Sequence, residues 1–546
     1  MQELKAAIEA ACRKLFEVDI DPELSRPEEK FGDFSTNAAL QLAKQLGKNP
    51  REAAAALAES LAGLPQLAEK PAVAGPGFVN FKLTDQALAK LTKNAAKLPQ
   101  PLKNKEILVE FGDPNPFKEM HIGHLYSYIA GDAIASLLEL NGADVKRLSY
   151  HGDVGPHIAK AVFGLRQLQN DQHGSDPIDD ENFLGKAYAH GAEQYENNPD
   201  AKAEIDKINQ HIYAKDDSEI NRLLKQGSDI SFSYFDKILD LLSISNDGRY
   251  LESQTVEPSI KLVKENTGRV FKQSQGAVVY DGEKAGLHTR VFITSKGLPT
   301  YDAKDLGLTA LKDKDYPKAA RSIIITGNEQ SEYFKVMLAA LKEIDKVLAE
   351  KTTHLSHGFV SLSTGKMSSR TGNVYPAMKL LLEVKDAVHK QYPDSAAKKQ
   401  ITFAAVKYAF LKHRLGSNIV LDIKESVSLE GNSGPYLQYA HARARQILAK
   451  SQSKAGQASD LTPGERSLAR KISEYPEVVA KATAELMPHH ICTYLYELAQ
   501  AFNRFYEQNR VIGDDRQAQR LQLVESYADV LRHGLGVLNI AAPEKV

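Results

Sequence analysis

A strand, a loop, a helix and a second strand follow one another between residues 107 and 150, and this order constrains the fold more than any other feature. The run 107–111 is short and mostly apolar, which is typical of a buried strand. A helical apolar spacing follows from His121 and stops at Asn141-Gly142, as helices often end at a glycine. A second strand covers 144–150. This order predicts a crossover connection between two parallel strands.

Two histidines flank a glycine, in His121-Ile122-Gly123-His124, where the first strand passes into the helix. A helix N-terminus has free N–H groups and a partial positive charge, so it attracts phosphate. The imidazoles add donors that can follow charge onto a phosphoryl oxygen, and Gly123, which lacks a Cβ, lets a flat ring or a sugar lie on the backbone. A pair of surface histidines is the alternative, but the strand–loop–helix context favours a phosphate site.

A small cationic loop provides a second signal, with the sequence Gly365-Lys366-Met367-Ser368-Ser369-Arg370-Thr371-Gly372-Asn373. Such a loop can close over a polyphosphate and stabilise its charge mainly in the transition state. Taken alone, the loop is equally well interpreted as a solvated basic turn.

Changes in periodicity divide the chain into three regions. Residues 1–100 have the pattern of a small α+β domain that ends in a proline- and lysine-containing linker. Residues 101–395 form a Rossmann-like region with a helical insertion near 159–280, and strand signals return at 277–280, 290–294, 322–326 and 358–362. Residues 396–546 are helical almost throughout. We therefore predict an α/β fold, in which a split Rossmann-like parallel-sheet domain joins an N-terminal α+β domain and a C-terminal all-helical domain.

The composition excludes several classes of protein. With 42% hydrophobic and 25% charged residues, the chain has an ordinary globular composition. It has no apolar stretch of about 20 residues that could span a membrane, and we expect no secretory signal. Two cysteines, Cys12 and Cys492, cannot form a disulfide framework or a cysteine-rich zinc site. These features favour a cytoplasmic protein without a membrane partner.

The charges of the chain nearly cancel, because 69 lysines and arginines stand against 70 aspartates and glutamates. A global basic field is therefore absent, and a nucleic acid would have to meet a local basic patch.

Together, the histidine signature and the cationic loop resemble the paired signatures of class I aminoacyl-tRNA synthetases. The surrounding residues narrow the resemblance to arginyl-tRNA synthetases. The resemblance covers nearly the whole chain and is weakest at 159–280. The surrounding residues are Phe31-Gly32-Asp33-Phe34, Gly77-Phe78-Val79-Asn80-Phe81, Val109-Glu110-Phe111, Pro114-Asn115, Lys118, Gly131-Asp132-Ala133, Gly152-Asp153, Pro299-Thr300-Tyr301 with Asp305, Gly434-Pro435-Tyr436 with Arg443, and Phe505-Tyr506.

The resemblance implies ATP-dependent ligation of arginine to its tRNA. The arginine carboxylate attacks the α-phosphorus of ATP and expels pyrophosphate, and the terminal adenosine of the tRNA then takes the aminoacyl group. ATP is a substrate, and Mg²⁺ is expected to accompany its phosphates. The family often needs bound tRNA before it activates arginine, and we expect the same here. We also expect a monomer, an N-terminal tRNA-contacting domain and a C-terminal anticodon-binding domain.

The resemblance also implies roles for particular residues. The expected catalytic residues are His121, His124, Lys118 and Lys366, and the expected ATP-binding residues are His121, Gly123, His124, Lys366, Met367 and Ser368. Arginine is expected to meet Glu110, Asn115, Tyr301, Asp305 and Gln330, because a guanidinium pairs with carboxylates in a planar, bidentate way. Contacts to tRNA are expected from Phe78, Asn80, Tyr436 and Arg443. Without the resemblance, a helix cap for Asp305 and a core position for Tyr301 remain the plainer interpretations.

The chain departs from the family pattern at two places. Ser369 stands where the loop usually has a second lysine, and we hypothesise that Lys118 replaces that charge, with Arg370 as a weaker candidate. The chain ends on Val546, whereas the family generally closes on methionine, so contacts made through that methionine are in doubt.

Two rival functions stay open at this point. One is another nucleotidyl-transferring enzyme of the same superfamily, although such enzymes are generally shorter and lack the long helical C-terminal region. The other is a catalytically silent synthetase-like protein that only binds RNA or partners, which the change at Ser369 keeps open.

Overall fold

The computed structural model describes residues 2–171, 181–363, 375–451, 455–456 and 460–546. It confirms the predicted α/β fold, with a five-stranded sheet at its centre in which every neighbouring pair is parallel. The strand order is β12-β11-β5-β6-β7, and the strands are β5 (Glu106–Glu110), β6 (Asp144–His151), β7 (Gly248–Leu251), β11 (Ala319–Gly327) and β12 (Thr352–His357). The two strands of the predicted crossover pair as β5 and β6, joined by α5 (Ile122–Leu140).

The order of the sheet reverses between β5 and β11. From β5 the chain adds β6 and β7 on one side, and it later adds β11 and β12 on the other side. In open parallel sheets, ligands bind outside the carboxyl ends of the strands at such a switch point. The register places Glu110, the last residue of β5, opposite Leu148 of β6 and Ile324 of β11.

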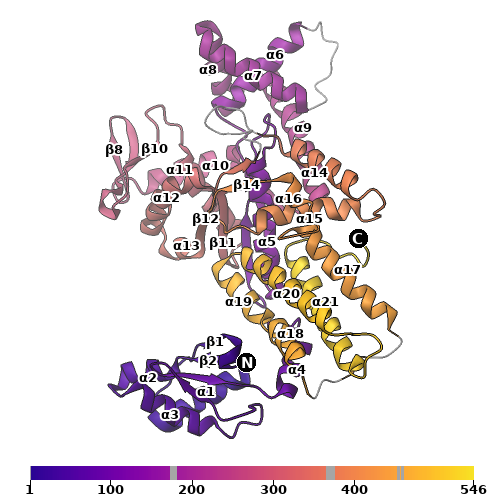
Figure 1. Cartoon of the computed structure of the whole chain (residues 1–546). Coiled ribbons are helices and arrows are strands. Elements are labelled where there is room, and N and C mark those ends of the chain that lie inside the picture. The colour runs from indigo at the N-terminus through magenta and orange to yellow at the C-terminus, as the bar shows by residue number, and fades with distance from the viewer. Residues whose placement is uncertain (1, 172–180, 364–374, 452–454, 457–459) are drawn as a thin grey trace.

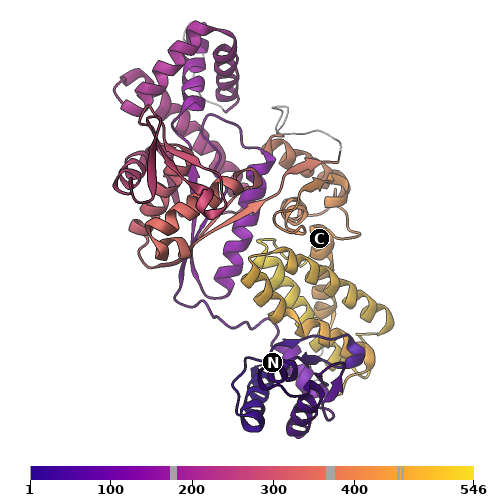
Figure 2. The ribbon, with the colours of Figure 1, turned by 90° about the vertical axis from the view of Figure 1, so that its left-hand side faces the viewer.

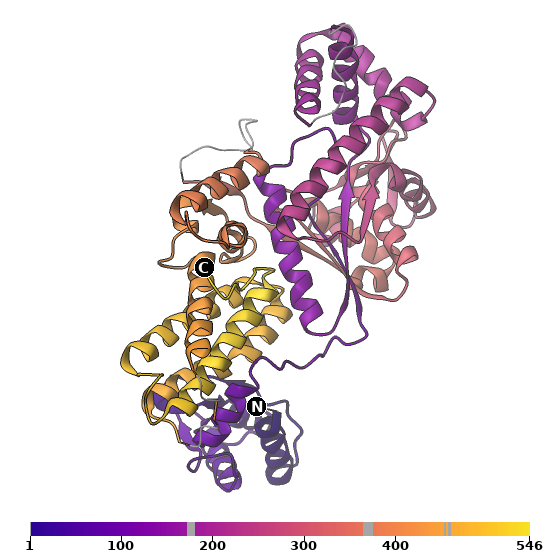
Figure 3. The same cartoon turned by 90° about the vertical axis from the view of Figure 1, so that its right-hand side faces the viewer.

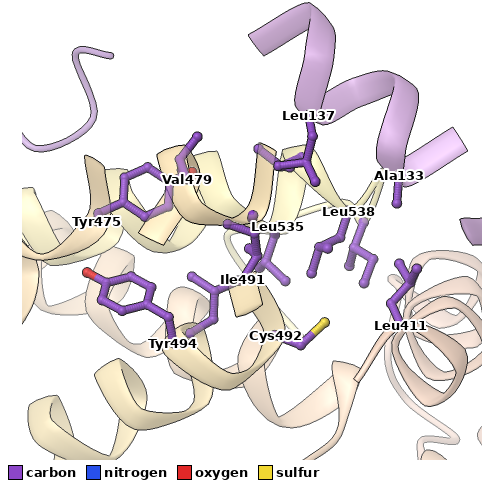
Figure 4. Close-up of a cluster of buried hydrophobic side chains, with 14 of the residues drawn as sticks. Ala133, Leu137, Leu411, Tyr475, Val479, Ile491, Cys492, Tyr494, Leu535 and Leu538 are labelled. Atoms are coloured by element: carbon purple, nitrogen blue, oxygen red, sulfur yellow. The ribbon is translucent and has the colours of Figure 1, made fainter. Parts of the chain in front are cut away.

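Helix α5 is buried nearly all round, although its sequence pattern indicated one apolar side. One side covers the central sheet and the other contacts the C-terminal helices (Figure 3). Figure 4 shows Ala133 and Leu137 of α5 in the same apolar cluster as Leu535 and Leu538. A helix that is apolar on all sides is typical of a position between two layers.

One polar side chain of α5 links these layers. Asp132 is 3% exposed and accepts hydrogen bonds from Arg147 of β6 and from Asn539 near the end of the chain. Helix α5 is therefore tied to the C-terminal segment by a buried carboxylate.

The polar stretch after β6 forms a helical body at the top of Figure 1, with its own apolar core. Its helices are α6 (Pro156–Asp171), α7 (Glu181–Asn197), α8 (Pro199–Ala214) and α9 (Ser218–Leu242). The last of these helices ends at Leu242, and β7 then returns the chain to the central sheet, so the helical body does not extend through the whole of 159–280.

After α10 (Glu252–Glu265), an antiparallel side sheet follows, formed by β8 (Phe271–Ser274), β9 (Ala277–Tyr280) and β10 (Arg290–Ile293). The strand signals at 277–280 and 290–294 belong to this side sheet. The two residues between β8 and β9 are too few for the crossover that parallel pairing requires.

The remaining elements surround the central sheet and form the C-terminal region. They are α11 (Tyr301–Asp315), α12 (Ser331–Ile344), α13 (Lys346–Lys351), β13 (Val360–Leu362), α14 (Ala377–Gln391), α15 (Lys398–Leu411), β14 (Ile419–Leu421), α16 (Ile423–Ser426), α17 (Gly434–Lys450), α18 (Pro463–Ser473), α19 (Tyr475–Glu485), α20 (His489–Gln508) and α21 (Gln517–Val537). The strands β13 and β14 pair in parallel, apart from the central sheet.

The N-terminal region lies beneath the C-terminal helices, at the opposite end of the molecule from α6–α9 (Figures 1 and 2). Its elements are α1 (Gln2–Phe16), β1 (Leu24–Ser25), β2 (Phe34–Thr36), α2 (Ala38–Leu46), α3 (Pro50–Leu61), β3 (Ala72–Ala74), β4 (Phe78–Phe81) and α4 (Asp85–Lys93), with an antiparallel sheet in the order β1-β2-β4-β3. Arg466 of α18 pairs with Asp33 and Asp85, which fixes this region to the helical one.

Candidate active site

A cavity of about 390 Å³ opens at the carboxyl ends of the central strands. Its walls come from β5, β6 and β11, from the start of α5, and from α11 and the short helix η3 (Asn328–Gln330). The predicted residues that line it are Glu110, Asn115, His121, Gly123, His124, Tyr301, Asp305 and Gln330. The cavity therefore joins the histidine signature to all of the residues expected to meet arginine, at the switch point of the sheet.

The two signature histidines cap the N-terminus of α5 with their side chains. Nδ1 of His121 accepts hydrogen bonds from the N–H groups of Gly123 (3.1 Å) and His124 (3.4 Å), and Nδ1 of His124 accepts one from the N–H of His121 (3.3 Å). The rings stack with centroids 3.6 Å apart, and a Cβ at Gly123 would lie 3.0 Å from the His121 ring. Because both Nδ1 atoms accept hydrogen bonds, each neutral ring carries its hydrogen on Nε2.

Both histidines are neutral at pH 7. Burial, together with the charges of His357 and Lys118, lowers the pKa of His121 to about 4. Burial also lowers the pKa of His124 well below its ordinary value. The signature therefore offers N–H donors and a helix N-terminus to an anion, and a full positive charge has to come from other residues.

Buried carboxylates gather at another part of the cavity wall. Burial raises the pKa of Asp305 to about 8, and the charge of Glu110 adds to this effect. Burial and the charge of Glu110 also raise the pKa of Asp113 well above its ordinary value. Lys312 of α11, with its side chain 2% exposed, forms an ion pair with Glu110. Three carboxylates thus share one buried lysine, an arrangement that favours the entry of a second cation.

The plainer interpretations of Asp305 and Tyr301 do not fit the structure. Asp305 lies inside α11, which begins at Tyr301, so Asp305 is not the N-cap of that helix. Tyr301 is 57% exposed and is not a core residue. Its ring lies 4.6 Å from Nζ of Lys304, which forms a buried ion pair with Glu252.

Two amide side chains are oriented by hydrogen bonds. Oδ1 of Asn115 accepts the backbone N–H of Gly152 at 2.9 Å, which leaves the amide NH₂ to donate to a ligand. A Cβ at Gly152 would lie 2.7 Å from that oxygen, so a glycine is required for this approach. Oε1 of Gln330 accepts a hydrogen bond from the Tyr333 hydroxyl at 3.1 Å.

Sequence reasoning missed several residues of the cavity wall. Asp113 and His357 lie at or just beyond the carboxyl ends of β5 and β12, and this position after a parallel strand was a usable signal. The buried lysines Lys304 and Lys312 carried no such signal, because their helix has a polar sequence and their acidic partners come from other elements.

Of the cations expected to bind phosphate, only Lys118 lies within the described residues. Lys366, Met367 and Ser368 fall in 364–374, outside the described residues, as do Ser369 and Arg370. The chain after this segment returns to the site, because Tyr375 lines the cavity and its carbonyl accepts the N–H of Ile122 at 3.0 Å. Lys118 is not part of the wall, and its Nζ lies 4.7 Å from the centroid of the Tyr188 ring.

None of the residues expected to contact tRNA lines the cavity: Phe78 and Asn80 lie on β4 of the N-terminal region, and Tyr436 and Arg443 lie on α17. Phe78 is 38% exposed, whereas Asn80, also on β4, is only 8% exposed. Tyr436 packs against Tyr496, and Arg443 lies 4.6 Å over the ring of Tyr506.

The C-terminal segment contacts two other basic side chains of α17. His441 is buried and bonds to the carbonyl of Pro543, and Arg445 pairs with Glu544.

Metal and membrane features are absent from the described part of the chain. Within those residues, no three His, Cys, Asp or Glu side chains are grouped to hold a metal ion. None of the helices described is both long enough and apolar enough to cross a membrane. Cys12 and Cys492 are both buried and unpaired.

Three family models match consecutive parts of the chain. An arginyl tRNA synthetase N terminal domain matches residues 2–83, the catalytic domain of class I tRNA synthetases (R) matches 86–422, and a DALR anticodon binding domain matches 437–546.

Known proteins agree with these matches. The arginine–tRNA ligase of Lactobacillus delbrueckii subsp. bulgaricus is 32% identical, over 97% of this chain and 96% of that protein. That of Limosilactobacillus fermentum is 30% identical, over 100% of this chain and 99% of that protein. The solved structure of Thermus thermophilus arginyl-tRNA synthetase superposes with a TM-score of 0.83 at 28% identity, covering 100% of both chains. The chain therefore belongs to the arginyl-tRNA synthetase family of class I aminoacyl-tRNA synthetases.

Proposed function

We propose that this arginine–tRNA ligase forms arginyl-adenylate in the cavity described above, with the carboxylate cluster holding arginine and the histidine signature holding ATP. One observation carries the proposal: a single cavity joins a carboxylate-rich wall, suited to a guanidinium, to a capped helix N-terminus with two neutral N–H donors, suited to phosphate. Adenylation needs these two partners in one place, because it depends mainly on positioning and on stabilising phosphoryl charge.

Arginine binds through its guanidinium to Asp305, with Glu110 and its partner Lys312 behind it. The buried cluster is short of positive charge, and a planar cation that pairs with two oxygens compensates it better than a point charge. The exposed ring of Tyr301 covers the entrance, and Asn115 and Gln330 contact the other polar groups of the amino acid.

ATP binds at the start of α5. The Nε2–H groups of His121 and His124 donate to the phosphoryl oxygens, and Gly123 lets the nucleotide approach the backbone. Neutral donors strengthen their hydrogen bonds as charge grows in the transition state, but they do not neutralise a triphosphate. Lys366 and Lys118 supply the cations, and Lys118 replaces the charge that Ser369 lacks.

Mg²⁺ accompanies the nucleotide. The described residues offer no cage of three or more ligands, which fits an ion held mainly by phosphates and one or two carboxylates. Of the carboxylates that line the cavity, Glu329 is the exposed one and would approach the ion. When bound, the ion neutralises developing phosphoryl charge.

tRNA contacts both ends of the molecule. We place the domain boundaries near residues 100 and 395, with Phe78 as the aromatic contact of the first domain and Arg443 with Tyr436 as contacts of the third. Because Asn80 is nearly buried, it acts mainly by shaping the strand that carries Phe78. The enzyme works as a cytoplasmic monomer, and its mass in solution at micromolar concentration tests the oligomeric state.

Aminoacylation of total tRNA with each amino acid in turn tests the function. We expect label from arginine alone, and ATP–pyrophosphate exchange that depends on arginine and is stimulated by tRNA. Exchange without incorporation into tRNA would favour another nucleotidyl transferase, and neither activity would favour an RNA-binding protein without catalysis. Robust exchange with arginine and no tRNA would contradict only the expected requirement for tRNA.

A further inference from the structure

We propose that the helical insertion α6–α9 positions Lys118, and that the ring of Tyr188 on α7 holds this lysine beside the phosphate subsite. The inference rests on the proposed role of Lys118 in adenylation. It adds that residues of the insertion place this lysine beside the phosphate subsite. Five contacts carry it: two hold Phe117, just before Lys118, one holds the lysine itself, and two hold the helix backbone on either side of Tyr188.

The backbone just before Lys118 is anchored in the insertion. Phe117 is 1% exposed and belongs to the apolar core of the insertion, not to that of the central sheet. Its N–H donates to Oγ of Ser231 on α9 at 2.8 Å. A Cβ at Gly227 would lie 2.1 Å from the Phe117 ring, so the glycine makes the pocket for that ring.

Phe117 also has an unusual backbone conformation. Its φ of +65° lies in the left-handed region, which a bulky residue rarely adopts unless its surroundings impose it. Here α9 imposes this conformation, through the pocket for the Phe117 ring and the hydrogen bond to Ser231. The direction in which Lys118 leaves the loop is therefore set by the insertion.

The side chain of Lys118 is held by the ring of Tyr188. Its Nζ lies 4.7 Å from the centroid of Tyr188, a cation–π contact. An aromatic face holds an ammonium without neutralising it, whereas a carboxylate partner would cancel the charge that the triphosphate needs. The charge of Lys118 contributes to the lowered pKa values of His121 and His124, behind burial and other imidazoles, so the lysine acts on the signature from this position.

The backbone that carries the ring is itself fixed, because α7 packs closely on α6 on both sides of Tyr188. A Cβ at Gly164 of α6 would lie 1.9 Å from the carbonyl oxygen of Ala187, and a Cβ at Gly191 would lie 1.8 Å from that of Lys160.

Helix α6 in turn begins at the cavity. A ring nitrogen of His157 lies 3.0 Å from the carbonyl oxygen of Gly152, a residue of the cavity wall. The ring of Tyr188 is thus connected to the active site through rigid helices.

The same helix provides a matched control. Tyr195 of α7 also stacks on lysines, with Nζ of Lys160 at 4.1 Å and Nζ of Lys202 at 5.3 Å, but neither lysine precedes the histidine signature. Tyr195→Leu removes the same kind of contact from the same helix without affecting Lys118.

The test is ATP–pyrophosphate exchange at saturating ATP and tRNA with the arginine concentration varied, measured for Tyr188→Leu, Tyr188→Phe, Tyr195→Leu, Lys118→Ala and the Tyr188→Leu/Lys118→Ala double variant. We expect Tyr188→Leu to lower kcat roughly three- to tenfold, with the KM for arginine unchanged. Tyr188→Phe keeps the π face and retains the wild-type rate, as does Tyr195→Leu. The double variant is no slower than Lys118→Ala, because Tyr188 acts through the lysine.

The outcomes separate the inference from the proposed function. A slow Lys118→Ala with a wild-type Tyr188→Leu overturns the inference and leaves the role of Lys118 in place, whereas a wild-type Lys118→Ala removes both. Effects that multiply in the double variant, or an equal loss in Tyr195→Leu, also overturn it. If a thermal melt shows Tyr188→Leu to be unfolded, Tyr188→Met, which fills the space without a π face, gives the same readout.

Discussion

Replacing Asp305 with asparagine removes a charge from the buried cluster while keeping the size and most of the shape of the side chain. In the empty cavity, burial and Glu110 raise the pKa of Asp305 to about 8, so the free enzyme holds a proton there at neutral pH. A guanidinium favours the ionised carboxylate, and arginine binding below pH 8 must therefore release that proton. Arginine affinity rises with pH up to about 8 and then becomes constant.

The size of this effect follows from the pKa. With a free-enzyme pKa of about 8 and a much lower value in the complex, the affinity at pH 8.5 exceeds that at pH 6.5 by about 25-fold, or about 2 kcal/mol. Asp113, whose pKa is also raised, acts in the same direction, and the titration belongs to the cluster as a whole. Asp305→Asn should remove most of the slope and weaken arginine binding at pH 8.5 by about 2–4 kcal/mol, because a charge-assisted pair is lost.

The assay is the KM for arginine in tRNA-supported pyrophosphate exchange between pH 6.5 and 8.5, with the KM for ATP as the internal control. A wild-type arginine KM that is flat over this range, or an Asp305→Asn variant that keeps the wild-type slope, would refute the reasoning.

The raised pKa of Asp305 also has a consequence for the stability of the enzyme. Because this pKa lies above the unfolded value of about 4, the free enzyme loses stability as the pH rises from about 4 to about 8 and loses no more above that, so Asp305→Asn should raise the melting temperature most at pH 8.5, less at pH 6 and little at pH 4.

Three further results follow from single contacts. Lys118→Ala should cost about 2 kcal/mol or more of transition-state stabilisation in adenylation. An unchanged rate of pyrophosphate exchange would contradict the proposed role of Lys118. Gly131→Ala should lower the free energy of unfolding by about 2–3 kcal/mol, because its Cβ would lie 2.2 Å from the Phe111 ring. The control Gly185→Ala, in a helix with open space around it, should be neutral or raise stability by up to about 1 kcal/mol in urea unfolding. Glu465→Gln should cost about 1.5–3 kcal/mol, because charge-assisted bonds from Arg516 and Arg520 to a fully buried carboxylate are lost, although both arginines keep an aspartate partner. Burial would raise the pKa of Glu465, but hydrogen bonds from those arginines lower it to about 2, so its stabilisation is present above pH 4.5 and lost as the pH falls through about 2; acid titration of the mutant should lack this loss.

Local patterns were enough to predict the centre of the fold. The apolar run at β5, the long helix ended by glycine and the strand at β6 depend on neighbouring residues, and all three appear in the structure. The strands β7 and β12 were missed, because Gly248–Leu251 is very short and Thr352–His357 has a single apolar residue, Leu355. Both are edge strands, and their positions depend on pairing with β6 and β11, which lie far away in sequence.

The candidate site likewise contains residues that local motifs predict and residues that only the fold brings together. His121, Asn115, Asp305 and the other expected lining residues belong to motifs, and the sequence was sufficient to name them. The partner of Glu110 could not be named, because a lysine on a polar helix is ordinarily solvated, and only the fold brings Lys312 beside it. The size of the pKa shift at Asp305 likewise depends on burial, which no local pattern reports.

The double-sided burial of α5 has a consequence for synthesis of the protein. The helix ends at Leu140, but the helices that cover its outer side end only at Val537, about 400 residues later (Figure 4). At the usual rates of translation, that apolar side stays uncovered for roughly 20 to 80 s on the ribosome. The nascent chain therefore carries an exposed hydrophobic stripe through most of its elongation. Packing of the C-terminal helices on α5 is the last step that protects this stripe from aggregation.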